Sequence, residues 1–197
     1  MSLPRQIRTA RLLLREPRPA DAGPLFDGIY ASAEVLLHLG LRPHGHSEQT
    51  RQHLSLALHR WLKQSGWLWV VALPSAQHPD GLAIGQVELT PMSHPGAQAH
   101  HLRLGYALGR PHWGQGWMRE AVGAVLAAAW HLPAAWRVDA LCDVDNHASS
   151  RLLTAVGMAC EGRLARAVVH PNVAPQPRDA WLHACTRPLS DVAPTPG

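Results

Sequence analysis

Hydrophobic positions in the first third of the chain change from a short run to a helical spacing. Residues 10–16 form the apolar run ARLLLRE, which predicts a first strand. Pro19 near a helix start and Asp21 in the first turn indicate a helix after it. From Ser47 to Gly66 apolar side chains recur every three or four positions. This spacing predicts a long helix that Ser47 caps and Gly66 ends.

The pattern then becomes that of strands separated by single helices. Three strand-like runs follow, at 67–74, 82–90 and 101–109. Turn-forming residues separate them, which is typical of hairpin connections. A helix from Trp117 to Leu132 follows. The remaining predicted elements are a strand at 136–144, a helix at 146–156 that Asn146 caps and Gly157 stops, and two closing strands at 158–169 and 178–187.

This order of elements predicts the fold class. Antiparallel hairpins combined with strand–helix–strand crossovers give a mixed α/β sheet covered by helices. The sequence has no internal repeat and no linker that would divide it. We therefore expect one domain over residues 1–190, followed by a loose tail at 191–197.

Composition and charge narrow the class of protein. Hydrophobic residues make up 46% and charged residues 16%, which is typical of a globular chain rather than a disordered one. Without a membrane-length apolar run or a signal-peptide pattern, we expect a cytoplasmic protein with no membrane partner. The net charge of +4 suits nucleic acid or a phosphorylated cofactor. The basic residues are scattered, so we expect no specific nucleic-acid binding.

Cysteine and histidine spacing gives no sign of a metal or a disulfide framework. Cys142, Cys160 and Cys185 are far apart and contain no CxxC pair, so buried thiols are expected. The 14 histidines show no HExxH or similar spacing. We therefore expect no metal cofactor.

Residues 109–121, GRPHWGQGWMREA, place Gly114 and Gly116 directly before a predicted helix. The first N–H groups of a helix lack partners and carry partial positive charge, and glycine lets an anion approach them. The pattern thus fits a pyrophosphate site fed by N–H groups of residues 114–118. A plain tight turn would use the same tripeptide. The P-loop and dinucleotide fingerprints are excluded, since GxxxxGK[ST] is absent and Arg119 stands where a third glycine is required.

A second motif, DNHASSRLLTAVGM at 145–158, makes a family resemblance plain. With RTARLLLREPRPAD near the start, LGYALGRPHWGQGWMREAV, EGRLARAVVHPN and PRDAWLHA, the chain resembles GNAT-superfamily N-acetyltransferases of the RimJ/RimL-like branch. The motifs span about residues 8–187 in the order found in that family. The resemblance implies a mostly antiparallel sheet that splits at its fourth strand, with helices on both faces and acetyl-CoA as co-substrate.

The resemblance also implies where the cofactor lies. The pantetheine arm is expected to bond like an added strand to the backbone of Tyr106, Ala107 and Leu108, and the pyrophosphate to lie on Trp113, Gly114, Gln115, Gly116, Trp117 and Met118. Asn146 would contact the arm or an ordered water, and Ser149 would protonate the leaving thiolate. From the residues alone, either side chain serves equally well as a helix cap.

The proton acceptor is less clear. The family often places a glutamate two residues before the position of Gly105, but this chain has Arg103, which cannot accept a proton. Glu88, His101 or a chain of waters remain as candidates, and we favour Glu88. Tyr106 is expected to serve the strand, and Glu120 is expected to be structural, because a carboxylate is stabilised in a first helical turn.

The expected function is transfer of acetyl from acetyl-CoA to a primary amine by direct attack in a ternary complex. The acceptor is either a protein N-terminal amine or a small-molecule amine, and the first two helices and the 91–100 loop are expected to bind it. The chain acts as a monomer or a homodimer. The alternative is a non-catalytic acyl-CoA-binding or regulatory protein on the same fold.

Overall fold

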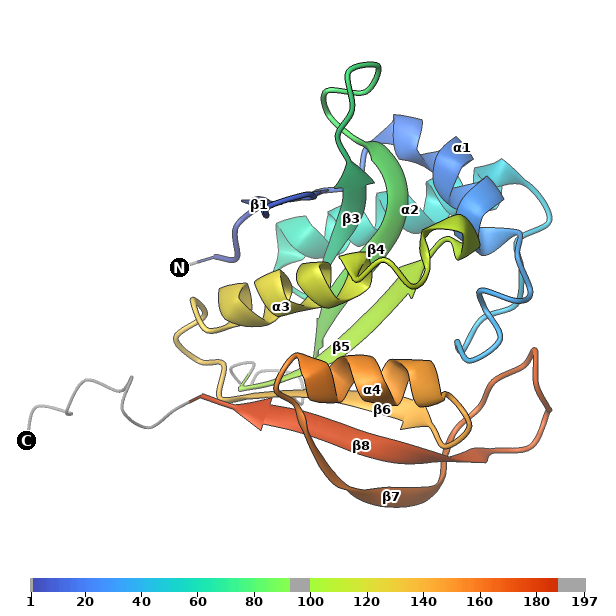
Figure 1. Ribbon diagram of the computed structural model, residues 1–197, viewed down its shortest axis with the longest axis vertical. Helices are drawn as coiled ribbons and strands as arrows, with labels where there is room; N and C mark the ends of the chain where they lie inside the picture. The colour runs from blue at the N-terminus through green and yellow to red at the C-terminus, as the bar shows by residue number, and fades with distance from the viewer. Residues whose placement is uncertain (1, 93–99, 188–197) are drawn as a thin grey trace, which may run out of the picture.

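Eight strands form one sheet in the order β1-β2-β3-β4-β5-β6-β8-β7 (Figure 1). The computed structural model describes residues 2–92 and 100–187. Neighbouring strands are antiparallel except for β5 and β6, which are parallel, so the predicted mixed sheet is confirmed. The strands are β1 Gln6–Arg8, β2 Leu13–Arg15, β3 Trp67–Leu73, β4 Leu82–Pro91, β5 His101–Leu108, β6 Arg137–Asp143, β7 Ala159–Val168 and β8 Arg178–Thr186.

Helices cover both faces of the sheet. One face carries α1 and α2, whose apolar side chains pack with β3 and β4, and the other carries α3 and α4 (Figure 1). Separate buried clusters form under the two pairs. The α-helices are α1 Ala22–Leu25, α2 Ser47–Lys63, α3 Trp117–Ala129 and α4 His147–Ala155; α1 lies between the short turns η1 Pro19–Asp21 and η2 Phe26–Tyr30, and η3 Arg110–His112 precedes α3.

The sheet splits between β5 and β6. Their parallel pairing covers only residues 101–103 opposite 137–139. Beyond that point the two strands diverge, and the gap between them widens toward the beginnings of α3 and α4 (Figure 1). This confirms the predicted split. The strand counted as the fourth in the sequence is β5, because the unpredicted strand β1 precedes the predicted first strand, which is β2.

Several predicted boundaries were wrong. The predicted first strand at 10–16 corresponds to the shorter β2, and β1 before it was not predicted; the two strands form a hairpin closed by the N–H of Thr9, which donates to the carbonyl of Leu12 at 3.0 Å. Helix α2 includes Ser47 as its first residue, so Ser47 is not the cap. Its end is two residues earlier than predicted, because Gln64 adopts a φ of 52° and Ser65 donates its N–H to the carbonyl of Arg60.

The expectation of three buried thiols was also wrong. Cys142 is buried, Cys185 is partly buried and Cys160 is exposed. The exposure follows from position, since Cys160 lies on the edge strand β7, most of whose residues are exposed. The predicted tail at 191–197 and most of the predicted 91–100 loop lie outside the described residues. Within the described part of the chain, no helix combines the length and apolarity that a bilayer span requires.

Candidate active site

The glycine loop leads from β5 into α3 and bends twice through left-handed backbone. Gly114 and Gly116 both have φ of 75°, a conformation that side-chain-bearing residues rarely adopt. A Cβ added to Gly114 would meet no atom within 4 Å, and one added to Gly116 would meet only Arg11 at 3.7 Å. The loop therefore needs glycine for its backbone and also leaves open space beside the N-terminus of α3. A phosphate fits this combination of open approach and helix dipole.

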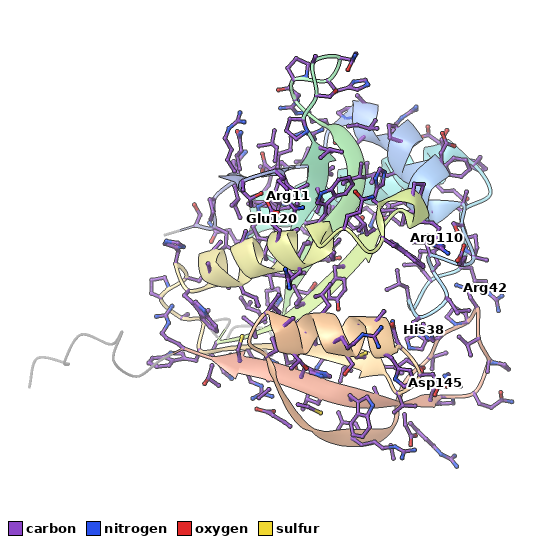
Figure 2. All side chains as sticks on the ribbon, in the orientation of Figure 1. Arg11, His38, Arg42, Arg110, Glu120 and Asp145 are labelled. Carbon is purple, nitrogen blue, oxygen red and sulfur yellow. The ribbon has the colours of Figure 1, made fainter. Side chains whose placement is uncertain are left out.

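A link from the N-terminal hairpin holds this loop. The Glu120 carboxylate accepts hydrogen bonds from the Thr9 hydroxyl at 2.6 Å, the Arg11 backbone N–H at 2.9 Å and Arg11 Nε at 2.7 Å. Arg11 Nη1 in turn donates to the Gln115 carbonyl at 3.2 Å. Figure 2 shows Arg11 and Glu120 together beside α3. Glu120 thus has the structural part predicted for it, and Arg11 is a contributor that the sequence prediction missed.

The charge of Glu120 is part of this link. Partial burial alone would raise the pKa of the carboxyl, but the hydrogen bonds from Thr9 and Arg11 outweigh that effect and hold the pKa below its ordinary value. The carboxylate is therefore ionised at neutral pH and offers acceptors to both partners.

Aromatic side chains stabilise the entry to the loop. Trp113 donates its indole N–H to the Leu108 carbonyl at 2.6 Å, and the Arg110 guanidinium lies 4.8 Å from the centre of the Trp113 ring. The Trp117 ring lies 5.3 Å from that of His112, and Met118 is buried in the core. These contacts fix the loop from both ends, so its backbone N–H groups are held in place before any ligand arrives.

The free edge of β5 faces the gap. The Gly109 N–H donates to the Ile84 carbonyl at 2.9 Å, which sets the phase of the β4–β5 ladder. Alternation then turns the main-chain groups of Ala107 toward β4 and those of Tyr106 and Leu108 toward the gap. Since the Leu108 carbonyl already accepts from Trp113, Tyr106 is the residue whose N–H and carbonyl are best placed for an added strand.

Two hydroxyls meet across the gap. Tyr106 Oη on β5 lies 2.6 Å from Ser149 Oγ on α4. Burial raises the pKa of Tyr106, so the phenol stays neutral and can donate a proton. Tyr106 therefore does more than serve the strand, a role that the sequence prediction did not include.

Asn146 is the N-cap of α4, as predicted. Its Oδ1 accepts the backbone N–H of Ser149 at 3.1 Å. At the other end Gly157, with φ of 88°, terminates the helix. The cap uses the backbone N–H of Ser149, whereas the Ser149 hydroxyl contacts Tyr106. Ser149 therefore takes part in the cap and in the contact across the gap through different atoms.

Glu88 lies on the opposite face of the sheet, below α1 and α2. It pairs in register with Gly105, where an added Cβ would meet nothing within 4 Å. Open space therefore adjoins the carboxylate beside the free edge of β5. The described ion pair with Arg60 at 2.7 Å and the hydrogen bond from Thr90 at 3.1 Å both use Oε1 of Glu88.

Tyr30 from η2, His44 and His53 form an aromatic wall next to Glu88. The Tyr30 hydroxyl donates to Gln86 Oε1 at 2.6 Å, and its ring stacks on His44 with centroids 4.6 Å apart. His53 from α2 lies 5.1 Å from the same ring, and burial lowers its pKa, which keeps the imidazole neutral. The sequence prediction missed this wall, because its members come from three separate segments.

His101 and Arg103 are both held by Asp139 at the closed end of the gap. Arg103 donates to both oxygens of the carboxylate at 2.8 Å, and His101 Nε2 lies 2.9 Å from Oδ2. Burial alone would raise the pKa of Asp139, but the Arg103 guanidinium holds it below its usual value. His101 thus faces a carboxylate, while Glu88 adjoins open space.

Comparison with known proteins adds a family match and several likenesses. The acetyltransferase (GNAT) domain family matches residues 11–159, about three quarters of the chain. A Bacillus subtilis protein described as the uncharacterized N-acetyltransferase YoaA is 26% identical over 183 residues, which cover 92% of this chain and 97% of that protein.

Solved structures share the fold. The microcin C7 self-immunity acetyltransferase MccE, in complex with acetyl-CoA and AMP, superposes with a TM-score of 0.78 at 15% identity over 91% of this chain and 94% of its own. RimL, a ribosomal L7/L12 alpha-N-protein acetyltransferase in complex with coenzyme A, gives 0.77 at 18% identity over 92% and 97%. This chain therefore shares its fold with both MccE and RimL.

Proposed function

The chain belongs to the GNAT family of acetyltransferases, and from this premise we propose that it transfers the acetyl group of acetyl-CoA to a primary amine in a ternary complex. The observation that carries the proposal is the arrangement around the split. An open glycine loop at the start of α3 and the free edge of β5 lie on one continuous path, which ends at the Tyr106–Ser149 hydroxyl pair. This path has the charge and hydrogen-bonding groups that a phosphorylated, amide-containing cofactor needs.

The loop residues Trp113, Gly114, Gln115, Gly116, Trp117 and Met118 bind the pyrophosphate in this proposal. Their backbone N–H groups are oriented by the left-handed glycines and by the Arg11 bond to Gln115. Preformed N–H donors cost little ordering on binding, which favours affinity.

Tyr106 and Leu108 guide the pantetheine arm along the edge of β5, and Ala107 supports them through its bonds to β4. The Tyr106 N–H, directed into the gap, also stabilises the oxyanion that forms when the amine attacks the thioester carbonyl. Breaking the carbon–sulfur bond releases a thiolate. Ser149 donates its proton to that sulfur and is resupplied through Tyr106 at 2.6 Å.

The amine reaches the thioester from the face that carries Glu88 in this proposal. The open space above Gly105 gives it room, and Glu88 accepts its proton through Oε2, directly or through a water. Asn146 keeps Ser149 in place as the helix cap and contacts the cofactor arm.

We propose the α-amine of a peptide or protein as the acceptor before a small-molecule amine. Support comes from RimL, whose name describes an alpha-N-protein acetyltransferase and whose fold this chain shares.

The test is release of free coenzyme A thiol from acetyl-CoA with a matched panel of acceptors. The panel holds peptides with a free α-amine, the same peptides blocked at the N-terminus but containing lysine, and small primary amines. We expect turnover with free α-amines and little with blocked peptides. Acetyl-CoA binding without thiol release on any amine would instead support a non-catalytic acyl-CoA-binding protein.

A further inference from the structure

Three side chains from distant segments converge at the open end of the split. His38 follows η2, Asp143 ends β6, and His170 follows β7. Their ligand atoms all lie within 4.8 Å of one another, with His38 Nδ1 3.9 Å from Asp143 Oδ1 and His170 Nε2 3.4 Å from Asp143 Oδ2. The two imidazole rings meet edge to face at 5.8 Å. Figure 2 shows His38 near Asp145, at the start of α4.

The nitrogens of this cluster lack partners although they are buried. The Asp143 side chain is 0% exposed and that of His170 is 8% exposed. Among residues 2–92 and 100–187, neither ring nitrogen of His170 nor Nδ1 of His38 makes a hydrogen bond. A buried polar atom without a partner is unfavourable, so a ligand that satisfies several of them at once is favoured here.

The charges around Asp143 sum to a negative value, which favours the binding of a cation. Arg178 donates to Asp143 Oδ2 at 2.6 Å and Oδ1 at 3.0 Å, and also to Asp145 Oδ2 at 2.5 Å. One guanidinium thus faces two carboxylates, which leaves a net negative charge. Asp143 Oδ1 also accepts the Asp145 backbone N–H at 3.0 Å, whereas Oδ2, among the described residues, accepts from Arg178 alone and keeps a lone pair for a metal.

We propose that His38, Asp143 and His170 bind a divalent transition-metal ion of the zinc type. Two imidazoles and one carboxylate form a donor set that zinc accepts, with a fourth position left for water. Zinc–nitrogen distances of about 2.0–2.1 Å place tetrahedral ligands about 3.3 Å apart. The His170–Asp143 separation of 3.4 Å already matches this spacing, and His38, 3.9 Å from Asp143, must move closer on binding. The sequence prediction of no metal rested on spacing, and these ligands share no local spacing.

The bound ion joins two loops that already touch. Asn172 Nδ2 donates to the carbonyls of Leu36 and Leu41 at 2.9 and 2.8 Å, which links the segment after β7 to the segment before α2. The metal adds His38 and His170 to this link and anchors both to β6 through Asp143. Its function is therefore to rigidify the loops at the open end of the split, and this holds whether or not the protein transfers acetyl.

The test uses the full chain after chelator treatment and dialysis, titrated with Zn²⁺ alone by calorimetry and with Co²⁺ alone by visible absorption. We expect one equivalent of Zn²⁺ to bind at micromolar or tighter affinity, a rise in the midpoint of thermal unfolding, and the intense visible bands of tetrahedral Co²⁺. His38→Ala and His170→Ala each weaken Zn²⁺ binding at least tenfold.

His147→Ala is the matched control, because His147 is an exposed histidine on the neighbouring α4 and should leave binding unchanged. Should His170→Ala fail to fold, the partly exposed His38 and the wild-type cobalt spectrum still decide. The proposal is overturned if the wild-type protein gives no tetrahedral cobalt bands, or if His38→Ala binds one equivalent of Zn²⁺ as tightly as the wild-type chain.

Discussion

The two sides of the split are built in different ways. On the cofactor side, one stretch of six consecutive residues, 113–118, supplies the proposed phosphate contacts, and its two left-handed glycines lie two positions apart. On the acceptor side, the pairs Glu88–Arg60 and Tyr30–Gln86 and the cluster of His38, Asp143 and His170 each join distant segments. Backbone donors can be encoded locally, whereas side-chain recognition is assembled by the fold. Cofactor binding is thus readable from spacing, and acceptor choice is not.

Gly114→Val is expected to have the largest effect, and it tests the locally encoded cofactor side. Both a left-handed φ and a side chain in the open space work against it, so we expect acetyl-CoA affinity to fall at least about 100-fold. The backbone strain alone costs about 1–2 kcal/mol in the free energy of unfolding. Calorimetric titration with acetyl-CoA measures the first quantity, and thermal unfolding measures the second.

Gly157→Val separates the two effects. Gly157 also has a left-handed φ, 88°, and an added Cβ there would also meet nothing within 4 Å, but it ends α4 away from the loop. It should lose similar stability and retain the cofactor. Equal losses of affinity in the two variants would mean that Gly114 matters only for folding.

The assembled side is tested by Glu88→Gln. The amide keeps the size of the side chain but cannot accept a proton from an ammonium, so we expect turnover at saturating acetyl-CoA to fall about 100-fold. Acetyl-CoA affinity should stay the same. Glu48→Gln is the control, since it breaks a comparable carboxylate–arginine pair with Arg51 on the exposed surface of α2. Wild-type turnover in Glu88→Gln would leave His101 or a water chain as the proton acceptor.

Ser149→Ala addresses the point where the two sides meet. Its backbone N–H still donates to Asn146, so the helix cap is preserved while the hydroxyl beside Tyr106 is lost. We expect turnover to fall about tenfold with little change in affinity, because the Tyr106 hydroxyl or a water still delivers a proton to the thiolate. Ser150→Ala, one residue further along α4, should have no such effect. An unchanged rate in Ser149→Ala would show that the hydroxyl takes no part in the reaction.

Substitution of Glu120 is expected to have the smallest effect on acetyl-CoA affinity. Protonation of the same carboxylate is expected to make that affinity depend on pH. The folded pKa of Glu120 is depressed, so the stabilisation is complete above the unfolded value of about 4.3 and is lost as pH falls through the folded value. Acetyl-CoA affinity should therefore decline as the pH falls below about 4.3 and Glu120 becomes protonated. Glu120→Gln should lower affinity only about threefold at pH 7, because the pair with Arg11 is partly exposed, and should flatten this decline. An unchanged acid decline in the variant would assign it to another group.

The fold and the proposed cofactor-binding residues could be predicted from the sequence, because both depend on local patterns of residues. The strand and helix periods, the Asn146 cap and the Gly157 stop are confirmed by the backbone. Sequence reasoning failed at Gln64, which ends α2 in a left-handed conformation that glycine usually takes. It also missed β1 and made the first strand too long, because three-residue strands are too short to show a period.

The remaining contacts around the split could not be predicted from the sequence, because they join residues that are far apart in the chain. Tyr106 and Ser149 lie 43 residues apart, and Asn172 reaches Leu36 across 136 residues. Arg103 and Asp139 are 36 residues apart, yet β6 provides the carboxylate that neutralises this arginine.

The bond between the N-terminal hairpin and the glycine loop has a practical consequence for cutting the chain into fragments. The family match begins at residue 11, yet Thr9 donates the 2.6 Å hydrogen bond that completes the Glu120 contacts. A fragment that begins at residue 11 would therefore keep Arg11, Glu120 and the glycine loop but lose Thr9, which is part of what holds the loop. Purification tags and fusion partners are best separated from Thr9 by the native residues before it.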